Sequence, residues 1–150
     1  MLRKVEHRAE MRTHANVLLR MEKVPNTPSR ILIIEDDPEI LSALNIVLGS
    51  VGFDVDVLLK GDSILRNQFV TPDVFLIDKW LPDVDGLDIC RYLKSKPNYK
   101  AIPVIMLSAS EQLRDRAFEA GADEFMEKPF LVQDLVDLIH KALENKNQIH

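Results

Sequence analysis

Four short apolar runs, each ending in polar or charged residues, constrain the fold of this chain more than any other feature. The runs cover residues 31–34, 74–77, 104–107 and 125–126, and they lead into Glu35-Asp36, Asp78, Ser108 and Glu127-Lys128. Apolar runs of this length are typical of strands buried inside a parallel sheet. Because the carboxyl ends of parallel strands form the ligand-binding edge of an open α/β sheet, we expect these polar side chains to lie together.

Strand and helix patterns alternate along the chain from residue 30 onward. An alternating segment at 54–58 predicts a half-buried strand near the sheet edge, and helical spacing predicts helices over 38–48, 62–68, 86–94, 111–120 and from 131 onward. Five such βα units predict a doubly wound, five-stranded parallel sheet with helices on both faces. Right-handed crossovers favour the flavodoxin-like strand order 2-1-3-4-5.

Two segments of different character divide the chain. Residues 1–29 are predicted to form a polar, partly helical N-terminal extension that ends in a Pro-containing linker, and residues 30–150 the α/β domain. A modest apolar stripe at Met11, Ala15, Leu18 and Met21 is compatible with a dimer arm or with a flexible remnant of an upstream segment. Only six residues follow the terminal helix, so we expect the domain to act through protein contacts.

Composition excludes several classes of protein. No apolar run approaches the ~18 residues of a membrane span, and the N-terminus has no apolar secretory core, so we expect a cytoplasmic protein without membrane insertion. The single cysteine, Cys90, rules out an internal disulfide and is expected to be buried. The net charge of −5 divides into +4 over residues 1–30 and −9 over the rest. An acidic domain argues against nucleic acid as a direct partner.

The acidic side chains at the strand ends predict a divalent cation. Glu35, Asp36 and Asp78 would repel one another unless a cation lay among their oxygens, and Mg²⁺ or alternatively Mn²⁺ suits hard oxygen ligands. Asp78 could be a structural ligand, or a nucleophile that takes a phosphoryl group. Ser108 and Lys128 would then help to neutralise the phosphoryl oxygens. Each residue alone has an ordinary explanation as a helix cap or turn residue, but their coincidence at four strand ends favours a site.

The order of five motifs resembles the CheY-like receiver domain of two-component response regulators. The motifs are the acidic pair at 35–36, Asp78 to Gly86, Ser108-Ala109, residues 120–123 and Lys128-Pro129-Phe130, and the likeness covers residues 30 to about 146. The resemblance implies that Asp78 is the phosphoacceptor and that Asp36 binds Mg²⁺ directly. It further implies that Glu35 acts on the metal through water and that Trp80 contributes its backbone carbonyl.

The same resemblance implies a switch and its partners. Ser108 would be the switch hydroxyl, Lys128 the ion-pair partner of the phosphoryl group, and Phe125 the aromatic residue that rotates. A sensor histidine kinase or a histidine phosphotransfer protein would donate the phosphoryl group. A downstream protein would read the fourth helix, fifth strand and fifth helix, and dimerisation is compatible with this reading. The domain would be no enzyme with an external substrate, but would promote its own phosphorylation and dephosphorylation.

Three features of the chain depart from the family pattern. The stretch from Ser108 to Gly121 is about two residues shorter than in many relatives, and Phe125 replaces a frequent tyrosine. Trp80 could gate water at an acyl phosphate or be an ordinary loop aromatic.

Two rival functions stay open as well. The motif of a metal-dependent phosphohydrolase that uses an aspartate nucleophile requires a second aspartate at the position of Trp80. A receiver-like interaction domain that no longer takes phosphate is disfavoured by the presence of all five site residues.

Overall fold

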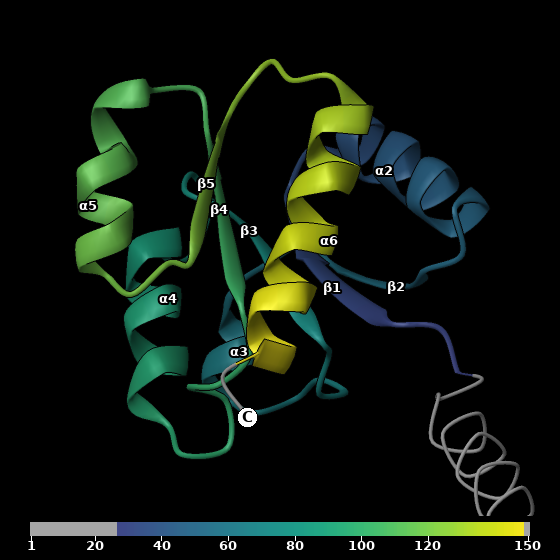
Figure 1. The fold of residues 1–150 in the computed structure, drawn as a ribbon. Helices are drawn as coiled ribbons and strands as arrows, with labels where there is room; N and C mark the ends of the chain where they lie inside the picture. Colours follow the sequence, from purple (N-terminus) through teal and green to yellow (C-terminus); the bar gives the residue numbers. More distant parts are fainter. Residues whose placement is uncertain (1–26, 149–150) are drawn as a thin grey trace, which may run out of the picture.

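A five-stranded parallel sheet forms the centre of the computed structural model, which describes residues 27–148 (Figure 1). In chain order the elements are β1 (Arg30–Ile34), α2 (Pro38–Ser50), β2 (Asp54–Leu58), α3 (Asp62–Leu65), β3 (Val74–Asp78), α4 (Gly86–Ser95), β4 (Val104–Ser108), the 3₁₀ turn η1 (Glu111–Leu113), α5 (Arg114–Glu119), β5 (Glu124–Glu127) and α6 (Val132–Gln148). The strand order β2-β1-β3-β4-β5 confirms the predicted flavodoxin-like topology.

Helices cover both faces of the sheet, as the alternating pattern predicts. α3, α4 and α5 pack on one face and α2 and α6 on the other, on the left and right of the sheet in Figure 1. Alternate residues of each central strand serve the two faces: Phe75 and Ile77 of β3 contact the α4 side, whereas Val74 and Leu76 contact the α2 and α6 side. Burial on both faces explains why β1, β3 and β4 are continuous apolar runs.

Helix caps set where the strands give way to helices. The Asp37 side chain accepts hydrogen bonds from the backbone N–H groups of Glu39 and Ile40, and Pro38 is the first residue of α2, as the sequence predicts.

Two expectations from composition can be compared with the structure. Cys90 is buried on α4, as expected, and burial raises the pKa of its thiol to about 11. Within residues 27–148, no helix is long and apolar enough to cross a membrane.

The predicted helices differ from the structure in their bounds: α2 and α4 extend two residues and one residue beyond their predicted ends, and α3, α5 and α6 differ as well. α3 ends at Leu65, short of the predicted residue 68, because Asn67 adopts a positive φ of 56° that a helix does not continue. The predicted helix over 111–120 divides into η1 and α5. α6 begins after Leu131, which is 72% exposed, and the Leu131 carbonyl accepts the first hydrogen bonds of the helix.

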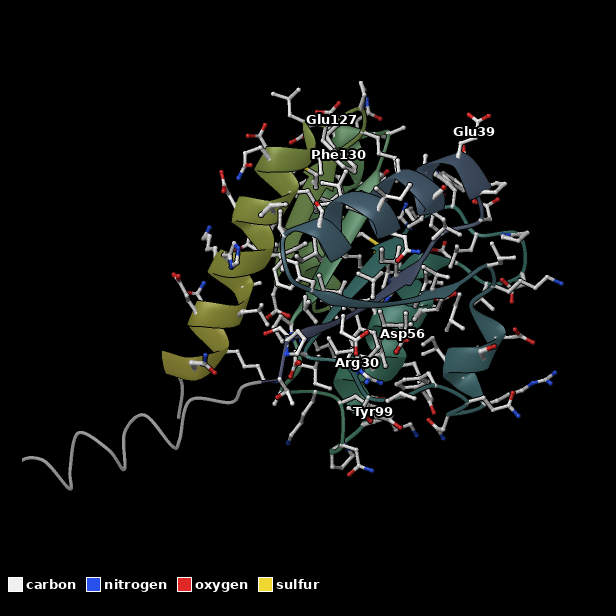
Figure 2. The ribbon with its side chains drawn as sticks, turned by 90° about the vertical axis from the view of Figure 1, so that its right-hand side faces the viewer. Arg30, Glu39, Asp56, Tyr99, Glu127 and Phe130 are labelled. Carbon is white, nitrogen blue, oxygen red and sulfur yellow. The ribbon has the colours of Figure 1, made fainter. Side chains whose placement is uncertain are left out.

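The expected N-terminal features lie largely outside the described part of the chain. The stripe at Met11, Ala15, Leu18 and Met21, and both explanations offered for it, fall on residues before 27. The first element of the described residues is β1, which begins at Arg30. Figure 2 shows Arg30 and Tyr99 at one end of the molecule and Glu39, Glu127 and Phe130 at the other, which is the end where the strands finish.

Candidate functional site

The buried polar residues of the described chain all lie at the carboxyl ends of three strands. They are Glu35, Asp78, Lys79 and Ser108, each at most 5% exposed. The register explains their proximity: Ile34 of β1 pairs with Ile77 of β3, so Glu35 and Asp78 occupy equivalent positions at the sheet edge. Removing a polar group from water costs free energy unless hydrogen-bond partners replace the water. No buried side-chain nitrogen or oxygen of the described residues lacks a hydrogen bond.

Three carboxylates gather at this edge. Glu35, Asp36 and Asp78 each offer one oxygen, and these oxygens lie within 4.8 Å of one another. Glu35 and Asp78 are buried, whereas Asp36 is exposed and keeps the cluster open to solvent. Hard oxygen donors in small number, with room for water, fit Mg²⁺, which shares its coordination sphere with waters and phosphate oxygens.

Lys128 pairs with two of these carboxylates. Its Nζ lies 2.6 Å from Oε2 of Glu35 and 3.4 Å from Oδ1 of Asp78. Its backbone N–H donates to the Ser108 carbonyl at 2.8 Å, which continues the β4–β5 pairing past the strand ends. The resemblance implies a phosphoryl partner for Lys128; in this structure the ammonium is held by the carboxylates.

The pKa shifts at the site reflect one ammonium serving two buried carboxylates. Burial raises the pKa of Glu35, and the charge of Asp78 adds to this, against the hydrogen bond from Lys128. The pKa of Lys128 is also raised: burial opposes the charged form, but the hydrogen bond to Glu35 and the charge of Asp78 outweigh it. The cluster therefore favours an added cation.

The raised pKa of Glu35 predicts a pH-dependent stability. As the pH falls, this carboxyl takes up its proton at a higher pH in the folded protein than in the unfolded chain, where its pKa is 4.5. The contribution of Glu35 to stability is thus present below pH 4.5 and lost as the pH rises through the folded pKa. In Mg²⁺-free buffer, we expect the free energy of unfolding of wild type, relative to Glu35→Gln, to increase as the pH falls from about 7. Urea unfolding at several pH values measures this, and a difference that stays constant or decreases would contradict it.

Ser108 and Phe125 occupy different parts of the neighbouring strands. Ser108 is fully buried at the end of β4, where its Oγ accepts a hydrogen bond from the Ser110 backbone N–H at 3.1 Å. Phe125 lies inside β5, is 5% exposed, and has the Arg114 guanidinium 4.9 Å from its ring centroid. Its ring is therefore directed into the core beneath α5.

The loop between β3 and α4 contains residues that the sequence reasoning did not single out. Lys79 is buried and its Nζ lies 2.8 Å from Oδ2 of Asp85, while the exposed Trp80 forms an isolated backbone bridge with Asp85. Period-two alternation from Phe75 and Ile77 was the available signal, because it places Lys79 on a buried face. The spacing alone does not identify Asp85 as its partner.

Gly86 is required by the close approach of α4 to β3. A Cβ at this position would lie 2.3 Å from the Asp78 carbonyl oxygen. Because the nearest atoms belong to backbone, Gly86→Ala must displace the start of α4, and we expect a loss of about 2–3 kcal/mol in the free energy of unfolding. Gly49→Ala is the matched control: its Cβ meets nothing within 4 Å, so we expect no loss. Equal effects of the two changes in denaturant unfolding would contradict this reading.

An apolar groove lies beside the site, between α2 and the loop before α6. It encloses about 370 Å³ and is lined by Ile40, Ala43, Leu44, Ala109, Lys128, Pro129, Phe130 and Val132. Lys128 therefore connects the groove with the carboxylate cluster. This places an apolar groove next to the charged site.

Comparison with known proteins matches the part of the chain that forms the sheet and its helices. The family model described as the response regulator receiver domain matches residues 31–140. The transcriptional regulatory protein TrcR of Mycobacterium tuberculosis is 33% identical over 135 residues, which are 88% of this chain and 52% of TrcR. The chain thus spans about half the length of the curated relatives it matches.

Solved structures share the fold. A crystal structure of a putative response regulator from Chloroflexus aurantiacus matches with a TM-score of 0.75 and 30% identity, covering 79% of this chain and 99% of that one. The receiver domain of sensor histidine kinase PA1611 from Pseudomonas aeruginosa matches with a TM-score of 0.72 and 26% identity, covering 79% of this chain and 99% of that domain. The latter structure has a magnesium ion coordinated in its active-site cleft.

Proposed function

The chain belongs to the response regulator receiver domain family, and on that premise we propose that Asp78 is its phosphoacceptor and that Glu35 and Asp36 hold Mg²⁺ beside it. The family model makes it a receiver domain of response regulators, which is a signalling domain of the two-component type. The observation that carries the residue assignment is the meeting of three carboxylates within 4.8 Å, with the Lys128 ammonium in contact with Asp78.

The chemistry follows from the position of Asp78. One carboxylate oxygen attacks the phosphorus of a phosphohistidine, the new O–P bond forms as the P–N bond breaks, and the histidine leaves with the bonding electron pair and takes up a proton. Mg²⁺, when bound, supplies positive charge to the phosphoryl oxygens. Asp36 would hold it directly and Glu35 through water, Asp78 and the Trp80 carbonyl would be further protein ligands, and Lys128 would add a second positive charge. Water later hydrolyses the acyl phosphate and restores the carboxylate.

The switch that we propose depends on competition for Lys128. Phosphorylation adds about −1.5 to −2 charges at Asp78, which compete with Glu35 for the ammonium. Lys128 and the Ser108 hydroxyl turn toward the phosphoryl oxygens, and the position of Phe125 changes with them. Contacts made in one state alone set the size of the population shift. The surface that reads this change is formed by α5, β5 and α6, which are the fourth helix, fifth strand and fifth helix counted from β1.

The partners we propose follow from the family and from the apolar groove. A sensor histidine kinase or histidine phosphotransfer protein would deliver the phosphoryl group by docking on the groove between α2 and Phe130, which borders the carboxylate cluster. We propose that this transfer occurs in the cytoplasm. The receiver domain itself, which carries a net charge of −9 from residue 31 onward, would contact a protein target and no nucleic acid directly.

One experiment distinguishes this function from its rivals. The protein is incubated with Mg²⁺ and a small phosphodonor such as acetyl phosphate, and the intact mass is followed with time. We expect a gain of one phosphoryl group that is lost slowly on removal of the donor and is prevented by chelation of Mg²⁺. Multiple turnover of external phosphate esters would support a phosphohydrolase. No gain in mass would support an interaction domain that takes no phosphate.

A further inference from the structure

Lys79 is a buried lysine next to the proposed phosphoacceptor, and the proposed mechanism gives it no task. It is 4% exposed, and its backbone N–H donates to the Leu107 carbonyl at 2.9 Å, so the pairing of β3 with β4 extends one residue beyond the end of β3. Its side chain follows Phe75 and Ile77 onto the face that α4 covers. An ammonium is stable in such a place only when it has partners.

Its partners are the two ends of the loop that connects β3 with α4. The Nζ atom of Lys79 lies 2.8 Å from Oδ2 of Asp85 and 3.7 Å from the centroid of the Trp80 ring. Trp80 and Asp85 also pair through their backbones, and the Gly86 N–H donates to the Lys79 carbonyl at 3.0 Å. The loop from 79 to 86 is thus closed on itself, with the Lys79 ammonium joining its two halves.

The contact with Lys79 gives the Trp80 ring a defined partner. Trp80 is 63% exposed, so burial contributes little to fixing its position. A cation over an indole face is the most favourable cation–π arrangement, and the low exposure of Lys79 strengthens it. The same Asp85 that binds Lys79 also caps α4, since its Oδ1 accepts a hydrogen bond from the Leu87 N–H at 2.8 Å. Lys79 therefore links Trp80 to the fixed start of α4.

Resting on the proposed function, we propose that Lys79 is a positioning residue that fixes the Trp80 peptide at the end of β3 and thereby raises the affinity of the carboxylate cluster for Mg²⁺. Groups behind a ligand set its orientation, and their loss weakens metal binding although they do not contact the metal. Lys79 acts through its two contacts, with Asp85 and with the Trp80 ring, and does not bind Mg²⁺ or the phosphoryl group.

The test replaces Lys79 with methionine, which has a similar length and no charge. In Lys79→Met we expect the Mg²⁺ dissociation constant, measured by calorimetry, to rise about tenfold. We also expect the fluorescence anisotropy of Trp80 to fall as its ring gains freedom, and the emission reports on this residue alone because the chain has a single tryptophan. The denaturant midpoint should change less than in a variant that leaves a buried carboxylate unpaired, because the Asp85 side chain is 38% exposed and water compensates its charge.

Two further variants separate positioning from general damage. Lys79→Arg keeps the charge, the ion pair and the stacking, so we expect Mg²⁺ affinity and anisotropy close to wild type. Lys96→Met is the matched control, because it also removes a lysine from an aromatic ring, that of Tyr92 at 5.0 Å, but at the exposed far end of α4. If Lys79→Met fails to fold, Lys79→Gln keeps a hydrogen bond to Asp85 without the charge and should give an intermediate loss.

The outcomes test the positioning role of Lys79 and the phosphoacceptor function of Asp78 separately. Wild-type Mg²⁺ affinity and wild-type anisotropy in Lys79→Met would overturn the positioning role, and so would equal losses in Lys79→Arg and Lys79→Met. Failure of wild type to bind Mg²⁺ would overturn it as well. A protein that shows the expected Lys79 effects on Mg²⁺ and Trp80 but gains no phosphoryl group would refute the phosphoacceptor function and leave the positioning role supported.

Discussion

Asp78→Asn is expected to abolish the gain of a phosphoryl group from a small phosphodonor. An amide has no anionic oxygen to attack phosphorus, and the neutral side chain removes one of the three carboxylates within 4.8 Å. Intact mass after incubation with the donor and Mg²⁺ measures the effect. The same change should leave the metal-free protein at least as stable as wild type, because it relieves the repulsion between Asp78 and Glu35.

The control for this change is an aspartate of α4. Asp88 is exposed and pairs with Arg91 at 2.7 Å on the surface, so Asp88→Asn should keep the full gain of mass. Peptide mapping of the phosphorylated wild-type protein should place the group on the peptide that contains Asp78. Phosphorylation that survives in Asp78→Asn, or that maps to another peptide, would show that a different residue is the phosphoacceptor.

Lys128→Met is expected to destabilise the metal-free protein by about 2–4 kcal/mol, since it leaves two buried carboxylates without their cation. Glu35 and Asp78 are 1% and 5% exposed, so water compensates them poorly. Mg²⁺ binds among the same oxygens, and by linkage a ligand of the folded state stabilises it. We therefore expect saturating Mg²⁺ to recover much of the lost stability, as measured by denaturant unfolding with and without the metal. We also expect the variant to lose the response of α5, β5 and α6 to phosphorylation.

Lys141→Met provides the comparison for Lys128→Met. Lys141 pairs with Glu124 at 3.2 Å, but its side chain is 61% exposed, and exposed ion pairs contribute about 0–1 kcal/mol. Its effect should be small and independent of Mg²⁺. A Lys128→Met variant as stable as Lys141→Met, or one that Mg²⁺ does not help, would show that the pairing with Glu35 and Asp78 has no energetic importance.

Local pattern was sufficient for the fold and for the acidic edge of the site. Burial of a central strand on both faces requires a continuous apolar run, and the first polar residue after it marks the carboxyl end of that strand. Glu35, Asp78 and Ser108 could be placed in this way because their positions depend on the strand that precedes each of them. The amphipathic spacing of α2, α4 and α6 was equally local, and so were the cap at Asp37 and the burial of Cys90.

Local pattern was insufficient where a side chain chooses among distant partners. The sequence by itself determined the alternation of strands and helices and the set of charged groups at the strand ends, because each depends on periodicity within a strand or helix. The strand order needed the additional rule that crossovers between parallel strands are right-handed. Only the tertiary structure decided that Lys128 contacts Glu35, 93 residues away, at 2.6 Å, and that Lys79 turns inward to Asp85 and the Trp80 ring. These contacts depend on register, on the close packing of α4 against β3 at Gly86 and on the space between packed elements, and the spacing of residues along the chain specifies none of these.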